Sequence, residues 1–397
     1  MAIGEIFTAP VGRITTGGAG ILNVQGKRIF MDLSAPGDTV TGRVVMESRR
    51  WARAELVELV EASPLRTTPP CPLYGNCGGC SLQHLNYRSQ IAEKAGILRD
   101  AFTRLGGVPL SGAIPVTPSP PWEYRNRIQL HRVPQGSGAS SSGAILGFKA
   151  RKSGEIIPVR DCPVSDPGLR AVLREASALP PPGRDRFTLY ARGDTLLSEG
   201  GIRRTKVPCK NTRQGAVLLR GKEIRMDAGV FFQSNGVMLE ELISGLLQAA
   251  AEADTELPMA DLYCGVGTFA AFLGEKFPRI DLVEENPGAI ALARENTRGM
   301  ETRLFAQTGD LWVKGCFIEN SYGFMVADPP RQGLSPALRK ALAEKGPPIL
   351  AYVSCDPATL ARDSGELIAG GYRLDRLRGY DFYPQTAHIE SLVVFKR

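Results

Sequence analysis

The C-terminal part of the chain, from about residue 236 onward, alternates short apolar runs with amphipathic stretches. The apolar runs, each the length of a buried strand, are MADLYC, IDLVEE, GFMVADPP, ILAYVSC and SLVVFKR. Helical stretches such as GVMLEELISGLLQAAAEA, GAIALARENT and PALRKALAEK precede or separate them. Strands that alternate with helices form a mainly parallel sheet, because each helix crosses a face of that sheet. Residues 236–397 therefore predict a doubly wound α/β domain that binds ligands at the carboxyl ends of its strands.

The first 62 residues predict an all-β unit instead. Short β-rich runs alternate there with turns such as the Pro-Gly-Asp at 36–38, which is typical of a small barrel. Basic and aromatic side chains are interleaved near its end, at Arg49, Arg50, Trp51 and Arg53. Such side chains bind RNA phosphates and stack on bases, although a solvated hairpin has the same composition.

Residues 63–235 predict a central, β-rich domain with one clear helix. Apolar residues recur at helical spacing over 91–105, and Gly106 and Gly107 end that pattern. The proline-rich stretch 115–124 predicts a linker, and β-rich runs follow it. This domain is basic, which suits either a nucleic-acid groove or a charged solvent face. The basic side chains are Arg125, Arg127, Arg132, Lys149, Arg151 and Lys152.

Three of the eight cysteines, Cys71, Cys77 and Cys80, lie within ten residues in CPLYGNCGGC. Closely spaced soft thiolates between glycines suit zinc or an iron–sulfur cluster. Either group usually needs a fourth ligand, and Cys162 in VRDCPVSD is the best downstream candidate. The spacing alone leaves zinc and iron–sulfur open.

The overall composition limits the class of protein further. Hydrophobic residues make up 43% of the chain, which excludes wholesale disorder. No apolar run approaches the roughly 18–20 residues that span a bilayer, and no secretory signal is visible, so we expect a cytoplasmic protein with no membrane partner. The 48 Lys and Arg against 41 Asp and Glu give a net charge of +7, which permits a nucleic-acid partner and equally fits an enzyme with a basic surface.

A glycine loop follows the first apolar strand of the α/β domain, in DLYCGVGTFA. Gly265 and Gly267 allow the backbone to approach a ligand closely, but the third glycine of the dinucleotide motif is absent. Glu284 closes the next strand, where a carboxylate can accept hydrogen bonds from a ribose. The combination suits a nucleoside cofactor without a pyrophosphate, S-adenosylmethionine rather than NAD, against the alternative of an ordinary turn beside an unrelated acid.

Reactive side chains follow three later strands. Asp328 stands in DPPR at a strand end, where two prolines stiffen the loop. Cys355 ends ILAYVSC, a position that suits a nucleophile beside a cofactor. His388 and Glu390 begin the last strand and alternate with Ile389, so both point to the same face. Taken singly, Cys355 would more often be a buried strand cysteine.

The ordered set CPLYGNCGGC, VFFQSN, DLYCGVGTFA, DPPRQGL, YVSCDP and HIESLVVF resembles the RNA uracil-5-methyltransferase family over essentially the whole chain. The resemblance is strongest to iron–sulfur-containing 23S rRNA (uracil-5-)-methyltransferases, whose N-terminal barrel is a TRAM domain. It implies a class I, Rossmann-like S-adenosylmethionine-dependent domain (236–397) after a TRAM-like barrel (1–62) and a central iron–sulfur domain (63–235). It implies a four-iron four-sulfur cluster on Cys71, Cys77, Cys80 and Cys162. It implies a nucleophile, Cys355, and a general base, Glu390. The implied S-adenosylmethionine contacts are Gln233, Tyr263, Thr268, Glu284, Asp310 and Asp328, with Thr268 standing where relatives often have Asn.

The chemistry of such a reaction explains the two catalytic residues. Carbon 5 of uracil becomes nucleophilic when a thiolate adds to carbon 6, so we expect the site to favour the anion of Cys355. A base must then remove the carbon-5 proton before the thiolate can leave, and Glu390 suits that task.

Other functions stay open at this point. A tRNA T-loop uracil-5-methyltransferase shares the same motifs. An RNA cytosine-5-methyltransferase also uses a thiolate, but typically has Pro directly before it, where this chain has Ser354. A non-catalytic iron–sulfur RNA-binding protein would have no use for both Cys355 and Glu390.

Overall fold

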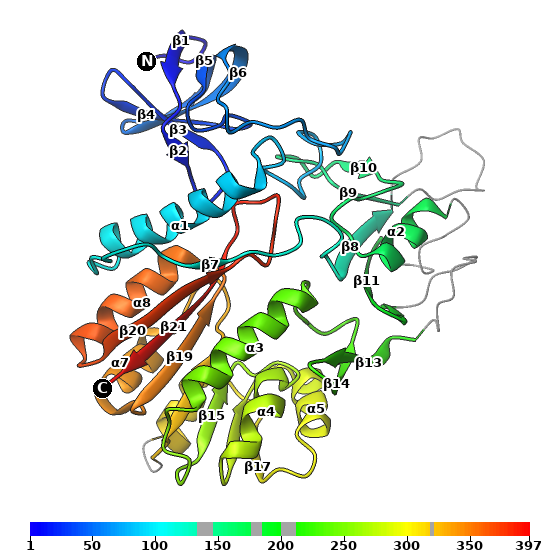
Figure 1. Cartoon of the computed structure of the whole chain (residues 1–397), viewed down its shortest axis with the longest axis vertical. Helices are drawn as coiled ribbons and strands as arrows, with labels where there is room; N and C mark the ends of the chain where they lie inside the picture. The colour runs from blue at the N-terminus through cyan, green and yellow to red at the C-terminus, as the bar shows by residue number, and fades with distance from the viewer. Residues whose placement is uncertain (133–145, 176–184, 200–211, 318–320) are drawn as a thin grey trace.

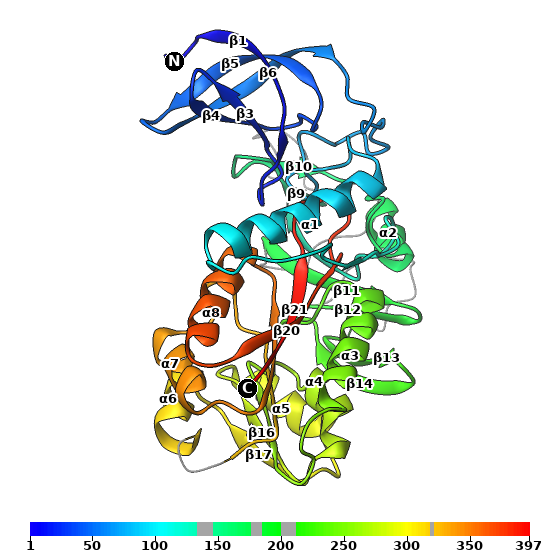
Figure 2. The same ribbon diagram turned by 60° about the vertical axis from the view of Figure 1, so that its left-hand side comes forward.

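The computed structural model describes residues 1–132, 146–175, 185–199, 212–317 and 321–397. An N-terminal sheet, a central sheet and a larger C-terminal sheet succeed one another along the chain (Figure 1). A long helix, α1 (Tyr87–Arg104), lies between the N-terminal and C-terminal sheets in both views (Figure 2). None of the described helices is long and apolar enough to cross a membrane.

The N-terminal sheet has six strands in the order β1-β5-β6-β4-β3-β2, which confirms the all-β prediction for this region. Three register shifts between β5 and β6 let the long hairpin bend, and the sheet encloses a small core that includes Leu22 and Ile29. Its strands are β1 (Ile6–Pro10), β2 (Arg13–Ile14), β3 (Gly20–Val24), β4 (Lys27–Met31), β5 (Thr39–Glu47) and β6 (Trp51–Glu61).

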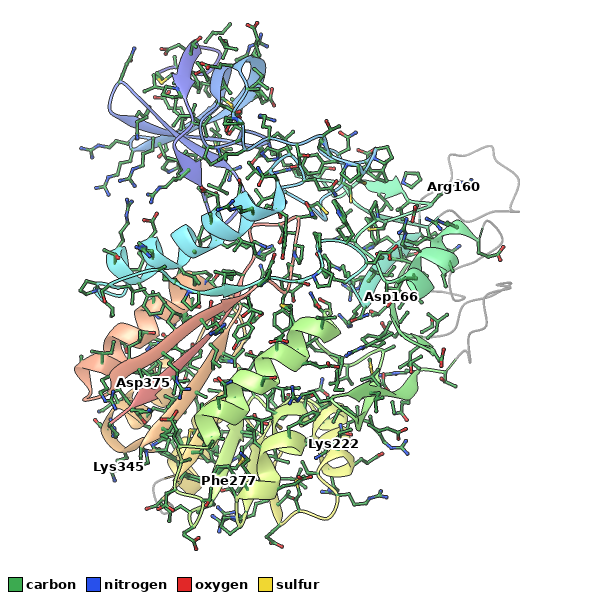
Figure 3. All side chains as sticks on the ribbon, viewed as in Figure 1. Arg160, Asp166, Lys222, Phe277, Lys345 and Asp375 are labelled. Carbon is green, nitrogen blue, oxygen red and sulfur yellow. The ribbon has the colours of Figure 1, made fainter. Side chains whose placement is uncertain are left out.

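The central sheet has five strands in the order β10-β9-β8-β11-β12, with α2 (Pro167–Arg174) packed on it. Asp166, which is labelled in Figure 3, begins α2. It accepts a hydrogen bond from Gly168 N at 2.8 Å. A separate hairpin, β13-β14, follows. The strands are β8 (Arg127–Arg132), β9 (Leu146–Lys149), β10 (Ile156–Pro158), β11 (Arg186–Arg192), β12 (Thr195–Ser198), β13 (Gln214–Leu219) and β14 (Lys222–Asp227).

The C-terminal sheet confirms the α/β prediction, with eight strands in the order β17-β16-β15-β18-β19-β21-β20-β7. The predicted strands are β15 (Met259–Leu262), β16 (Ile280–Val283), β18 (Phe324–Ala327), β19 (Ile349–Ser354) and β21 (Glu390–Lys396). Strand β21 runs antiparallel to β19. The sequence pattern did not single out β17 (Thr302–Phe305) and β20 (Arg373–Tyr380).

Helices cover both faces of this sheet, so its central strands are apolar on both sides. One face packs against α3 (Gly236–Ala250), α4 (Thr268–Leu273) and α5 (Pro287–Asn296). The other face packs against α6 (Gly309–Trp312), α7 (Pro336–Lys345), α8 (Pro357–Ala369) and the end of α1.

Two features tie the central region to the C-terminal sheet. The stretch that we predicted as a linker contributes an edge strand, β7 (Val116–Thr117), which pairs in parallel with β20. On α1, Lys94 forms an ion pair of 2.5 Å with Asp381, and both side chains are fully buried. Residues from outside 236–397 are therefore part of the C-terminal sheet and its core.

Candidate active site and cysteine pocket

The loop between β15 and α4 has the tight geometry that its glycines predict. Gly265 and Gly267 adopt positive φ angles of 53° and 76°, and Tyr263 does so at 60°. A non-glycine residue pays steric strain in this region and is found there mostly where the surroundings fix it, often at functional sites. Asp261, at the centre of β15, accepts a hydrogen bond from Ala270 N in α4 at 3.1 Å and so holds strand and helix together.

Glu284 is fixed at the end of β16 by the neighbouring backbone. Its Oε2 accepts a hydrogen bond from Gly265 N at 3.1 Å, and its Oε1 accepts one from Asn286 N at 2.7 Å. The carboxylate therefore keeps one orientation toward the cavity while its remaining lone pairs stay available, as ribose binding requires.

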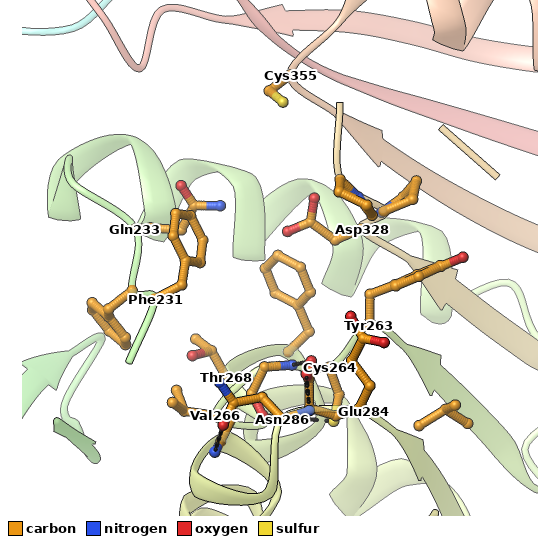
Figure 4. Close-up of a pocket in the computed structure, with 18 of the residues that line it drawn as sticks. Phe231, Gln233, Tyr263, Cys264, Val266, Thr268, Glu284, Asn286, Asp328 and Cys355 are labelled. Carbon is orange, nitrogen blue, oxygen red and sulfur yellow. Dashed lines mark hydrogen bonds between the residues drawn. The ribbon is translucent and has the colours of Figure 1, made fainter. Parts of the chain in front are cut away.

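A cavity of about 670 Å³ opens at the carboxyl ends of β15, β16, β18 and β19. All eight residues expected for catalysis and methyl-donor binding line it, together with His388. Figure 4 shows Cys355 at one end, Gln233 and Asp328 beside the space below it, and Thr268 and Glu284 at the other end. The cavity lining includes Gln233, Tyr263, Thr268, Glu284, Asp310, Asp328, Cys355 and Glu390.

The register of the last strands brings Cys355 and Glu390 together. Ser354 of β19 pairs with Ser391 of β21 in an antiparallel ladder. Cys355 directly follows Ser354, and Glu390 directly precedes Ser391. Because the ladder is antiparallel, Cys355 and Glu390 lie opposite each other on neighbouring segments. The proposed nucleophile and base are therefore neighbours at the cavity wall.

Two carboxyl groups of this cavity, those of Asp328 and Glu390, have raised pKa values. Burial raises the pKa of Asp328 to about 7, while a hydrogen bond from Gln233 acts in the opposite direction. Burial, together with the negative charge of Asp328, also holds the pKa of Glu390 well above its usual range. Glu390 Oε1 is buried and has no hydrogen-bond partner among the described residues, so it is available to a group bound in the cavity.

The expectation that the free site favours the thiolate of Cys355 is wrong. Burial, followed by the negative charges of Glu390 and Asp328, raises the pKa of this thiol to about 11. Arg331, which also lines the cavity, acts in the opposite direction but does not outweigh them. The sequence alone does not place Glu390 and Asp328 near Cys355, because their proximity depends on how the strands pair in the sheet.

The four predicted metal ligands line a second cavity, of about 330 Å³: Cys71, Cys77, Cys80 and Cys162. All four are free cysteines. Burial raises the pKa of Cys71 and Cys77, and that of Cys80 to about 12. We call this cavity the cysteine pocket. Within the described part of the chain, no three His, Cys, Asp or Glu side chains are placed to hold a single metal ion.

Three residues near these cavities were not predicted as site residues. Arg331 follows the two prolines after Asp328, and Tyr383 precedes β21, and both line the larger cavity. Arg125 lines the cysteine pocket, and its charge also faces Tyr383. Arg331 could have been predicted as a site residue, because it directly follows the Asp-Pro-Pro at a strand end. Arg125 and Tyr383 could not, because they are brought together only by the tertiary fold.

Comparison with known proteins assigns the family. The model of the tRNA (uracil-5-)-methyltransferase family matches residues 310–397, and that of the methyltransferase small domain matches residues 223–349. The 23S rRNA (uracil(1939)-C(5))-methyltransferase RlmD of Acidithiobacillus ferrooxidans is 30% identical over 433 residues, which cover 97% of this chain and 96% of that protein. The chain belongs to the RNA uracil-5-methyltransferase family.

Two further likenesses agree with this family assignment. A protein of Aquifex aeolicus named as an uncharacterized RNA methyltransferase is also 30% identical, over 97% of each chain. The crystal structure of Pyrococcus abyssi tRNA (uracil-54, C5)-methyltransferase with S-adenosyl-L-homocysteine superposes with a TM-score of 0.72 at 24% identity, over 98% of this chain and all of that one. The fold is thus that of an S-adenosylmethionine-dependent methyltransferase, and the protein is an RNA-modifying enzyme of this class.

Proposed function

We propose that the enzyme methylates carbon 5 of one uridine in 23S rRNA through a covalent adduct with Cys355, which Glu390 resolves. The observation that carries this proposal is the strand register, which makes Cys355 and Glu390 neighbours in one cavity with the methyl-donor residues. The named RlmD relatives, aligned over nearly their full length, support rRNA as the substrate and the cytoplasm as the location.

In the first step, the thiol of Cys355 loses its proton to solvent, and the thiolate adds to carbon 6 of the target uracil, which turns carbon 5 into a nucleophile toward the methyl donor. The raised pKa of Cys355 means that this step needs help from the bound substrates. S-adenosylmethionine supplies the methyl group and carries a permanent positive charge on its sulfur. A cation held between Asp328 and Cys355 would counter the carboxylates and favour the thiolate.

In the second step, Glu390 removes the proton from carbon 5 after the methyl group has arrived. The thiolate then leaves carbon 6, and the double bond re-forms. A carboxylate whose pKa is raised by burial is a stronger base than an exposed one, so Glu390 in its ionised form suits the task. The target base has to leave its stack to reach Cys355, which costs a few kcal/mol.

We propose that Gln233, Tyr263, Thr268, Glu284, Asp310 and Asp328 bind the methyl donor. Glu284 would accept hydrogen bonds from the ribose hydroxyls, because its orientation is already fixed by Gly265 N and Asn286 N. Asp310 is held by a hydrogen bond from the hydroxyl of Ser335, which keeps it at the wall of the cavity.

The cysteine pocket is proposed to hold a four-iron four-sulfur cluster. Four free thiols around a cavity of about 330 Å³ fit a group larger than one ion, whereas zinc needs its ligands around a single centre. The methyl transfer moves no net electrons, so the cluster would serve to fix the fold around Cys71, Cys77, Cys80 and Cys162. The N-terminal sheet is proposed to be a TRAM-like RNA-binding barrel.

A tRNA substrate is the second candidate, because the matching family model is named for tRNA (uracil-5-)-methyltransferases. The deciding experiment maps 5-methyluridine in 23S rRNA and tRNA from cells with and without the protein. Loss of the modification from one rRNA position supports the proposal, and loss from the tRNA T-loop alone contradicts it.

The mechanism is tested with the substitution Glu390→Gln. We expect this variant to accumulate a covalent complex with RNA that survives a denaturing gel, whereas Cys355→Ala forms none. Turnover by Glu390→Gln at the wild-type rate would contradict the assignment of the base.

A further inference from the structure

The loop that leads into β21 is held almost entirely by residues from outside the C-terminal sheet. We call residues 381–389 the β21 entry loop. Four consecutive carbonyl oxygens, at 382–385, accept hydrogen bonds from other segments at 2.8–3.1 Å. The donors are the side chains of Asn235, Lys94 and Tyr124, and the backbone N–H groups of Ser81 and Leu82.

Gln385 is the centre of these contacts. It is buried, with 3% of its surface exposed, and has a φ angle of 67°, which a non-glycine residue adopts at a cost. Its backbone N–H donates to Gln90 Oε1 at 2.9 Å, and Gln90 Nε2 donates to its Oε1 at 2.9 Å. This reciprocal pair joins the loop to α1 and provides part of the energy that keeps the backbone in that conformation.

The same loop is bonded to the residue that directly follows Cys80. Ser81 N and Leu82 N both donate to Gln385 O at 2.9 Å, and Ser81 Oγ accepts a hydrogen bond from Ala387 N at 3.2 Å. A short route of covalent and hydrogen bonds therefore connects the cysteine pocket to the strand that begins with Glu390.

The start of the loop has an anchor of its own. Lys94 Nζ donates to Asp381 Oδ1 at 2.5 Å and to Tyr383 O at 3.0 Å. The loop is thus fixed to α1 at two places, at its start through Lys94 and at its centre through Gln90. The residue that it positions, Glu390, has its buried Oε1 without a partner among the described residues. The place of this carboxyl group is therefore set by its backbone.

We propose that Ser81, Gln90 and Gln385 are positioning residues for Glu390, so that the cysteine pocket and α1 control the proton-removal step. This inference rests on the proposed role of Glu390 as the base. A base has to lie within hydrogen-bond reach of the proton that it takes, and displacements of about 1 Å can slow a reaction substantially. The methyl-donor residues at the ends of β15 and β16 make none of the contacts described here, so the positions of those residues do not depend on this loop.

The test uses two substitutions that weaken the loop in different ways. Gln90→Met keeps the length of the side chain and removes both amide bonds to Gln385, together with the bonds that Gln90 Nε2 donates to Leu82 O and Leu85 O. Ser81→Ala removes the single acceptor for Ala387 N. The matched control is Ser63→Ala, because Ser63 Oγ accepts a backbone hydrogen bond from Leu65 N at the same distance of 3.2 Å, far from the entry loop in sequence.

Each full-length variant, with its metal content measured, is mixed with RNA and S-adenosylmethionine. The covalent RNA complex, the methylated product and the affinity for S-adenosylmethionine are followed separately. We expect Gln90→Met to slow the decay of the covalent complex about tenfold, so that the complex accumulates. Ser81→Ala should show a smaller effect in the same direction. Donor affinity and metal content should equal those of the wild type, and Ser63→Ala should not accumulate the complex.

The outcomes separate the two proposals. If Glu390→Gln accumulates the complex but Gln90→Met and Ser81→Ala behave like Ser63→Ala, the positioning role is refuted and the base assignment stands. If Glu390→Gln accumulates none, the base assignment itself fails. If the loop variants lose donor affinity and product in parallel, without accumulating the complex, the contacts serve folding alone and the positioning role is also refuted.

Discussion

The active-site cavity and the cysteine pocket are built in different ways. The larger one lies where parallel strands end, so its residues are placed by the topology of the sheet. The cysteine pocket lies between strands β8 and β9 of the central sheet and a segment between β6 and α1 that has no regular helix or strand and carries Cys71, Cys77 and Cys80. We therefore expect the first cavity to keep its shape without a ligand, and the second to depend more on what its cysteines bind.

Electrostatics extends this comparison. Burial raises the pKa of Cys80 in the cysteine pocket and that of Cys355 in the larger cavity, so both sites disfavour these thiolates until a further positive charge binds. The larger cavity would receive its positive charge with each methyl donor, once per turnover. The cysteine pocket would receive its positive charge once, during maturation, and keep it.

The largest expected effect is that of removing the nucleophile. Cys355→Ala should lower methyl transfer to RNA by about 10⁴-fold or more, because no other group can form the adduct. The fold and the affinity for S-adenosylmethionine should be unchanged, since the sheet builds this cavity. Methyl transfer is measured with radiolabelled donor, and thermal unfolding is the control. Loss of the fold in this variant would contradict the view that the cavity is independent of its thiol.

Removing a thiol from the cysteine pocket should lower the stability of the fold, which removing Cys355 should not. Cys80→Ser should lose iron and lower the unfolding temperature, because metal-binding energy is also folding energy. Iron analysis and thermal unfolding measure both effects, and Cys162→Ser should reproduce them. A Cys80→Ser variant that keeps its metal and its stability would remove the distinction between the cavities.

The pH dependence tests the thiol of the larger cavity. With a pKa of about 11, Cys355 is mostly protonated at neutral pH, so its thiolate fraction rises with pH. In the absence of donor, adduct formation with RNA should increase by about tenfold per pH unit from pH 7 to pH 9. Bound S-adenosylmethionine should shift this rise to lower pH. A flat profile without donor would mean that the thiolate is already formed in the free enzyme.

The smallest effect is expected at the tip of the N-terminal sheet. Lys27, Arg28, Arg49 and Arg50 lie together there. Replacing Arg49 by Ala should weaken RNA binding a few-fold at low salt and reduce the slope of log affinity against log salt by about 1. Titrations at several salt concentrations measure this slope. An unchanged slope would mean that Arg49 faces solvent and does not contact RNA.

Much of this organisation could be predicted from the sequence, because the motifs lie at strand ends. The apolar runs around Asp328 and Cys355 are short, bounded and separated by helices, so their place at one edge of a sheet follows from general rules. The neighbouring positions of Cys355 and Glu390 did not follow from the pattern, because they depend on an antiparallel last strand. The high pKa of Cys355 depends on the same arrangement.

The contacts between distant segments could not be predicted. Val116 and Thr117 look like part of a proline-rich linker, and their pairing with β20 depends on where the ends of that segment are held. Lys94 occupies one position of an otherwise ordinary helix, and its partner Asp381 lies 287 residues away in the chain. Side-chain spacing along one segment carries no information about such partners.

The edge strand β7 has a consequence for how this enzyme can be divided. Its two residues come before the central sheet in the chain, yet they cover the outer side of β20 in the C-terminal sheet. A fragment cut to begin at residue 236 would expose an open sheet edge, prone to pair with other molecules, and would leave the carboxylate of Asp381 buried without its lysine. The methylating half is thus not a portable module, and exchanging RNA-binding halves between relatives would have to carry residues 87–117 along with the catalytic part.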